Sequence, residues 1–262
     1  MVPAASYHPP ERTSRVTCSK SRSRGRRAGW WALAALAAVF VSAGGAANPA
    51  AATVKPKGKA LGAAHVAWWQ WALSLPLSTH PLNPDANMTC ATGQVGKQWY
   101  IGQAVNSGGT VTRDCTIPSG TKLVVAVANI ACTTLEPFPF NGTDEPSLRA
   151  CAAGVVDPQS PLFIERPFAT LDGRSLAVKR APSPLFEFWV PSTSDNILFC
   201  APNCAGTAGI AVADGYLLRL HPLRVGNHTL RTGGTFPALA YELDITYNIT
   251  VVPRGHWHQP PT

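Results

Sequence analysis

Single side chains, not motifs, are all that this sequence offers for catalysis. The chain contains no GxSxG elbow, HExxH pair, phosphate-binding loop, GxGxxG turn or EF-hand spacing. If the protein is an enzyme, the candidates for acid, base or charge stabilisation are His80, Arg113, Glu136 and Asp214. An isolated group of this kind is more often a turn cap or a surface residue than a catalyst, so no catalytic residue is assigned.

Aromatic side chains offer a different chemistry, because a sugar ring stacks on an exposed indole or phenol ring. The candidates for such ligand binding are Trp69, Trp99, Tyr100 and Trp189. Tryptophan is more often a core residue, however. In residues 59–75, apolar side chains recur at helical spacing and place Trp68 and Trp71 on one stripe, with Trp69 at its edge. We therefore predict a helix that buries Trp68 and Trp71 and leaves Trp69 more exposed.

Metal and cofactor sites are not indicated by the sequence. It has no CxxC pair and no Cys/His spacing typical of zinc sites. His221 and His228 flank a turn without an apparent third ligand, and His256 and His258 lie in a proline-rich tail. We expect no metal and no cofactor.

Six cysteines follow the N-terminal leader, and an even number is typical of disulfides formed in an oxidising compartment. Sequence alone does not select one connectivity among the many that six cysteines allow. Proximity along the chain favours three pairs, which are Cys90 with Cys115, Cys132 with Cys151, and Cys200 with Cys204.

Basic residues are concentrated at the N-terminus. Residues 1–52 hold seven of the 22 Lys and Arg and one of the 14 Asp and Glu, so the rest of the chain has 15 and 13 and a net charge of +2. A nearly neutral body lacks the basic surface that nucleic-acid binding requires. We therefore expect no nucleic-acid partner.

An uncharged segment, residues 28–47, follows the basic leader, residues 1–27. Its strongly apolar centre, Trp30 to Val41, has the length of a signal-peptide core, and the small residues up to Ala52 resemble a cleavage site. The sequence therefore predicts export to the periplasm or medium. The alternative is an inner-membrane anchor formed by uncleaved residues 28–47, which would be the only link to a membrane.

Short strand-like runs separated by Gly and Pro turns dominate the remaining chain, which has 22 Gly and 24 Pro. Residues 97–105 and 110–116 alternate around a Gly-rich loop and predict a hairpin, while residues 121–130 are apolar on both faces and predict a central strand. Residues 143–153 predict a short helix. We predict a mainly β protein, an antiparallel β-sandwich of jelly-roll or immunoglobulin-like type, with a linker at 53–59, one domain at 60–252 and a flexible tail at 253–262.

Three stretches resemble a group of exported bacterial proteins that has no established activity. They are the Trp68-Trp-Gln-Trp-Ala-Leu-Ser-Leu-Pro76 segment, the Cys115-Thr-Ile-Pro-Ser-Gly120 segment with the residues before it, and the final Gly226-Asn-His-Thr-Leu230 and Asp244-Ile-Thr-Tyr-Asn-Ile-Thr-Val251 segments. The resemblance covers roughly residues 60–252. It implies export and a β-sandwich, and it assigns no catalytic residue.

Two hypotheses of different classes follow. The first is a non-catalytic exported module that binds a glycan or another component of the cell envelope. The second is a secreted polysaccharide hydrolase or lyase with an open groove, since a β-sandwich can assemble such a groove without any sequence motif. A membrane-tethered structural protein is a third alternative. Convergence of the four candidate catalytic residues in one cleft would favour the enzyme.

Overall fold

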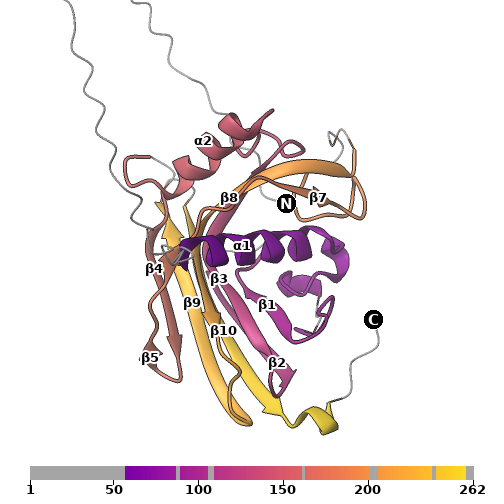
Figure 1. Ribbon diagram of the computed structural model, residues 1–262, viewed down its shortest axis with the longest axis vertical. Coiled ribbons are helices and arrows are strands. Elements are labelled where there is room, and N and C mark those ends of the chain that lie inside the picture. Colours follow the sequence, from indigo (N-terminus) through magenta and orange to yellow (C-terminus); the bar gives the residue numbers. More distant parts are fainter. Residues whose placement is uncertain are drawn as a thin grey trace, which may run out of the picture. The chain divides into compact units, whose positions relative to one another are not determined.

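Two β-sheets packed against each other form the body of the structure (Figure 1). Sheet A runs in the spatial order β1 (Gln98–Gly102), β3 (Lys122–Thr133), β8 (Ala208–Leu220) and β6 (Lys179–Arg180), and β7 (Phe186–Trp189) also pairs with β8. Sheet B runs in the order β2 (Gly109–Pro118), β10 (Tyr241–Val252), β9 (Gly226–Phe236), β4 (Glu165–Leu171) and β5 (Arg174–Ser175). The predicted mainly β, sandwich-like architecture is confirmed.

The computed structural model describes residues 57–86, 89–105, 109–160, 163–200, 204, 206–237 and 240–257. All of them belong to the unit that spans residues 53–262. The predicted leader, the apolar segment 28–47 and the cleavage zone lie outside the described residues. No helix in the described part is both long and apolar enough to cross a bilayer.

Strand β3 is the central strand of sheet A, as its apolar sequence predicts. One face of the strand, with Val125 and Val127, joins the core between the two sheets. The other face, with Val124 and Ala126, packs beneath the N-terminal helix α1 (Lys57–Leu73). A strand covered on both faces favours apolar side chains on both, which explains the apolar run from Leu123 to Ala128.

The predicted hairpin between the first two strands is wrong. Strand β1 pairs in parallel with β3 in sheet A, whereas β2 pairs in parallel with β10 in sheet B. The two strands therefore lie in different sheets, and the sandwich contains two parallel pairs among its antiparallel ones. Strand β2 is buried mainly in its second half, so it fits the edge of sheet B, where one face meets the core.

Helix α2 (Glu145–Val156) confirms the helix predicted from its capping residues. The Asp144 carboxylate accepts a hydrogen bond from the Ser147 amide at 2.9 Å, and Pro146 lies in the first turn. Leu148 and Ala152 pack against Cys132 of β3 and Val212 of β8. In Figure 1 this helix lies beyond one end of those strands.

All three predicted disulfides are present, with Cα–Cα distances of 5.3, 6.1 and 5.1 Å for Cys90–Cys115, Cys132–Cys151 and Cys200–Cys204. These distances are normal for disulfides. The second bridge ties α2 to β3, and the third closes a small loop between β7 and β8.

Two segments expected to be loose are partly structured. Helix α1 begins at Lys57, inside the expected linker. In the expected tail, a 3-10 helix (Arg254–His256) precedes Trp257, whose ring packs edge-on against Trp99 with centroids 5.4 Å apart. The sandwich thus uses the indole of Trp257 to cover Trp99.

Candidate functional site

An exposed tryptophan on the edge of sheet A is the centre of the best candidate site. Strand β7 alternates between buried and exposed residues, so Phe186 and Phe188 face the core while Glu187 and Trp189 face outward. Trp189 is 65% exposed. Phe138 is more exposed still, at 88%, but it lines none of the three hollows described below, whereas Trp189 lines two of them.

Two shallow hollows meet at Trp189, and together they are called the Trp189 face here. The α1–β7 hollow has a volume of about 390 Å³ and is lined by Gln70, Ser74, Glu187, Phe188 and Trp189. The β7–β8 hollow has a volume of about 440 Å³ and is lined by Thr134, Glu187, Phe188, Trp189, Ala208, Gly209 and Ile210. Each is large enough for one sugar ring, and both are lined by Glu187, Phe188 and Trp189.

Helix α1 holds β7 in place beside the first of these hollows. The side-chain amide of Gln70 donates a hydrogen bond to the Glu187 carbonyl oxygen at 2.9 Å. The Ser74 hydroxyl donates to the Trp71 carbonyl oxygen at 2.8 Å, which fixes that hydroxyl at the end of the helix. Polar atoms of the hollow are therefore positioned by the fold before any ligand arrives.

A third hollow of about 340 Å³ lies at the other sheet. It is lined by Thr89, Ala91, Asp114, Thr116, Val252, His256 and Trp257. Asp114 accepts a hydrogen bond from the Asn248 side-chain amide at 2.9 Å, and so is already engaged within sheet B. The tryptophan in this hollow, Trp257, is half-buried because its ring packs against Trp99.

The other predicted aromatic ligands are inside the protein. Trp69 is 7% exposed and Trp99 is 3% exposed, and Tyr100 is half-buried and stacked on Trp71 with centroids 5.6 Å apart. The expectation that Trp69 is the exposed tryptophan of its helix is therefore wrong. The segment around Pro182 also packs against α1, since a Cβ on Gly62 would lie 2.8 Å from the Pro182 carbonyl oxygen. The helix consequently buries more than one stripe.

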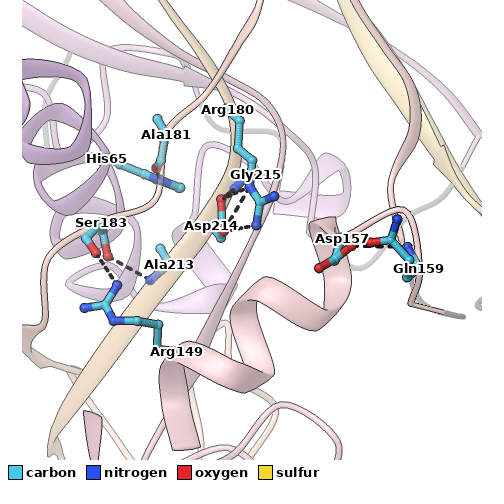
Figure 2. Close-up of polar contacts among 10 residues, drawn as sticks. All are labelled: His65, Arg149, Asp157, Gln159, Arg180, Ala181, Ser183, Ala213, Asp214 and Gly215. Carbon is cyan, nitrogen blue, oxygen red and sulfur yellow. Dashed lines mark hydrogen bonds and ion pairs between the residues drawn. The ribbon is translucent and has the colours of Figure 1, made fainter. Parts of the chain in front are cut away.

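Trp69 belongs to a buried polar cluster around His65. The Nδ1 of His65 donates to the Ala181 carbonyl oxygen at 2.6 Å, which fixes the tautomer because that oxygen can only accept. Its Nε2 then accepts from the Trp69 indole at 3.2 Å and from the Asn129 side-chain amide at 3.0 Å. Figure 2 shows His65 beside Ala181. Burial lowers the pKa of His65 to about 4, so the ring is neutral and acts as a structural connection.

Asp214 lies near this cluster and is paired. Its carboxylate accepts from the Arg180 guanidinium at 2.6 Å and from the Gly215 amide at 2.8 Å (Figure 2). The Asp214 side chain is almost fully buried while Arg180 remains partly exposed. A buried carboxylate with these partners is neutralised by the ion pair and stabilises the β6–β8 contact.

His80 and Arg113 lie together, but they hold a loop. The His80 Nε2 donates to the Ala72 carbonyl oxygen at 2.9 Å, and its Nδ1 accepts from the Leu82 amide at 3.0 Å. Arg113 donates to the carbonyl oxygens of Pro81 at 2.5 Å and of Leu82 at 2.6 Å. Burial lowers the pKa of His80 to about 4. Both side chains thus satisfy backbone groups of residues 80–83.

Glu136 is separate from the other three candidates. Burial raises the pKa of its carboxyl group well above the usual value, which favours the protonated form. Its Oε2 has no hydrogen-bond partner among the described residues. Glu136 lines none of the three hollows.

The four candidate catalytic residues therefore do not converge. His80 and Arg113 fasten a loop, Asp214 is in an ion pair with Arg180, and Glu136 is alone at the end of β3. General acid and base catalysis requires two such groups within reach of one bound substrate. The open-groove enzyme hypothesis lacks this shared cleft.

The structure also bears on the metal candidates. Within the described residues, no group of three or more His, Cys, Asp or Glu side chains is placed to hold a metal ion. His228 instead bonds Asp172 through Nδ1 at 2.8 Å and the Arg224 carbonyl oxygen through Nε2 at 3.0 Å. It therefore braces the turn before β9.

Sheet arrangement and disulfides place this chain in a broad class, that of mainly β domains of two packed sheets stabilised by disulfide bonds. No known protein family matches the chain, and no curated protein matches it. Among solved structures, that of amebosin aligns with 55% of this chain and 96% of its own, at 10% identity and a TM-score of 0.18. PbICP-C, solved in complex with falcipain-2, aligns with 60% of this chain and 100% of its own, at 9% identity and a TM-score of 0.21. Likenesses this weak carry no argument.

Proposed function

We propose that this protein is an exported, non-catalytic β-sandwich that binds a glycan of the cell envelope or its surroundings through the Trp189 face. The observation that carries the proposal is the 65% exposure of Trp189 at the junction of two hollows. An exposed indole flanked by amide, hydroxyl and carboxylate groups matches the amphipathic character of a sugar, which has apolar C–H faces and polar edges.

Export is supported by two independent features. The basic leader followed by an apolar segment is typical of a signal peptide. Three disulfides are typical of proteins that fold in an oxidising compartment. A fusion of residues 1–60 to a reporter that functions only outside the cytoplasm is expected to be active, and retention of that fusion in the cytoplasm would refute export.

Glycan binding is tested by comparing the purified protein and its Trp189→Ala variant on a panel of immobilised glycans. The stacking interaction supplies much of the affinity in such a site, so binding is expected to fall at least tenfold, which corresponds to about 1.4 kcal/mol. Val225→Ala is the matched control, because Val225 is 58% exposed and follows the opposite end of β8. If both variants bind as the parent does, the Trp189 face is not the ligand site.

Catalysis is tested on the same preparations by incubating each bound glycan with the protein and measuring new reducing ends or unsaturated sugars. We expect neither product. Turnover that survives Trp189→Ala but is lost in Glu136→Gln or Asp214→Asn would instead support the hydrolase or lyase.

A further inference from the structure

We infer that the glycan recognised at the Trp189 face is an amino-sugar polymer with free ammonium groups, bound across at least two consecutive rings. This inference rests on the proposed function and specifies the ligand class of the same site. Its basis is the charge and hydrogen-bonding character of the groups that line the two hollows around Trp189.

Charge is the first argument. Among the described residues that line the two hollows, Glu187 is the only ionisable one, and it lines both of them. Because β7 alternates, its carboxylate lies on the same outward face as the Trp189 ring, two residues away. A site with one acid and no basic lining residue repels uronic acids and sulfated sugars and attracts a cationic sugar.

Hydrogen bonding is the second argument. The hydroxyl hydrogen of Ser74 is used by the Trp71 carbonyl oxygen, and one amide hydrogen of Gln70 is used by the Glu187 carbonyl oxygen. The Ser74 oxygen, the Gln70 amide oxygen and the Glu187 carboxylate are left as acceptors. Such a set selects a ligand that brings donors, and an ammonium group brings three on one atom.

The aromatic ring is the third argument. A cation near the face of a tryptophan is attracted by the quadrupole of the ring, more strongly than by any other aromatic side chain. Trp189 therefore contributes to the binding of an ammonium-bearing sugar in two ways. The indole contacts the C–H face of the sugar ring, and it attracts the positive charge of the ammonium group. A neutral glucan gains only the first contribution.

The ligand length follows from the geometry of the hollows. The α1–β7 hollow of about 390 Å³ and the β7–β8 hollow of about 440 Å³ share Glu187, Phe188 and Trp189, while the first extends to Gln70 and Ser74 of α1 and the second to β8. One ring placed on the indole leaves the second hollow empty. A ligand of two or more rings fills both, so affinity is expected to rise steeply from the monosaccharide to the disaccharide and to level off beyond a few rings.

The test measures the affinity of the full-length protein for three soluble hexamers, a glucosamine hexamer, a β-linked glucose hexamer and a polyuronate hexamer. We expect the glucosamine hexamer to bind roughly tenfold more tightly than the glucose hexamer, because it adds one charge-assisted hydrogen bond to Glu187. The uronate hexamer is expected to bind most weakly. Added salt is expected to weaken only the glucosamine complex.

Two variants separate the contributions. Glu187→Gln is expected to reduce glucosamine hexamer affinity about fivefold to tenfold and to change glucose hexamer affinity by less than twofold. The control Glu242→Gln removes an exposed acid from β10 in the other sheet and is expected to change neither. Trp189→Ala is expected to weaken both hexamers.

The outcomes distinguish this inference from the proposed function. Binding that depends on Trp189 but favours the glucose or uronate hexamer, or does not respond to Glu187→Gln, overturns the amino-sugar inference and leaves glycan binding standing. Loss of Trp189 dependence with all three hexamers also overturns the inference. The proposed function fails as well only if the whole glycan panel is indifferent to Trp189→Ala.

Discussion

Helix α1 and strand β7 carry tryptophans in opposite environments: those of α1 are buried against sheet A, and that of β7 is exposed. Trp68 and Trp69 are 1% and 7% exposed, and both indole nitrogens donate to internal acceptors, the Ile101 carbonyl oxygen and His65. Trp189 lies on the neighbouring strand and is 65% exposed. The difference shows that the partner of each ring, and not the residue type, decides whether a tryptophan stabilises the fold or is available to a ligand.

Removing a buried ring is expected to have the largest effect. Trp68→Ala deletes a side chain packed between α1 and sheet A, together with its hydrogen bond of 3.0 Å to Ile101. We expect the free energy of unfolding to fall by roughly 3–5 kcal/mol, the usual cost of deleting a large buried aromatic. Chemical denaturation measures it, and a loss below about 1 kcal/mol would show that the helix is not anchored through this ring.

Acid is expected to weaken the same region through its two buried histidines. Burial lowers the pKa values of His65 and His80 from 6.5 to about 4 in the folded protein. Above pH 6.5 both states are neutral and the stability is complete. As the pH falls from 6.5 to 4, the unfolded chain binds protons that the folded protein does not, so each histidine lowers the free energy of unfolding by about 3 kcal/mol, and the two together by about 6 kcal/mol.

The buried Glu136 gives a pH dependence of stability opposite to that of the histidines, so the parent protein alone does not show the histidine contribution. Comparing a histidine variant with the parent isolates it. Burial raises the pKa of Glu136 well above 4.5, so its contribution to stability declines as the pH rises. His65→Gln is expected to flatten the dependence of unfolding free energy on pH between 4 and 6.5 relative to the parent. The control is His228→Gln. The hydrogen bond to Asp172 raises the pKa of His228, so its contribution is lost only above pH 6.5, and this variant is expected to keep the parent's slope between pH 4 and 6.5. A parent-like slope in His65→Gln would contradict the prediction.

The disulfide between α2 and β3 is expected to contribute somewhat less to the free energy of unfolding than the buried ring of Trp68. Replacing both Cys132 and Cys151 by serine opens a loop with a sequence separation of 19, for which loop entropy gives about 3 kcal/mol. Replacing Cys200 and Cys204 opens a separation of only 4, for which we expect about 2 kcal/mol. Thermal unfolding of the two double variants gives the order, and the reverse order would contradict the entropic explanation.

Trp189→Ala is expected to have the smallest effect on stability. Most of its side chain stays exposed to water in the folded protein, so the free energy of unfolding should change by less than about 0.5 kcal/mol. The same substitution is expected to have a large effect on ligand binding. A destabilisation close to that of Trp68→Ala would remove the contrast between the two regions and show that Trp189 is a packing residue.

Local patterns were sufficient for several elements of this fold. The apolar run of β3, the cap of α2 at Asp144 and the nearness in sequence of the paired cysteines each depend on residues close together in the chain. The hairpin prediction failed because the pairing of β2 with β10 joins Asp114 to Asn248, and no local pattern reports such a distant partner. Adjacent strands pair often, but the rule is statistical.

The site was only partly predictable for a similar reason. Trp189 was among the four aromatic candidates, and the alternation of residues 186–189 agrees with its exposure. Trp69 was misplaced because helical periodicity assumes one buried stripe, whereas β7 and the chain near Pro182 cover a second side of α1. Gln70 and Ser74 were missed altogether, since only the approach of α1 to β7 brings them to the Trp189 ring.

The parallel pairing of β2 with β10 has a consequence for how the chain folds. Ten residues of β2, Gly109 to Pro118, pair with Leu243 to Val252, which come much later in the chain. The pairing of β2 in sheet B therefore cannot form before Leu243 to Val252 have been synthesised, and it involves contacts of very long sequence separation. Such topologies fold slowly. Strand β2 consequently stays without its sheet partner until β10 has been made.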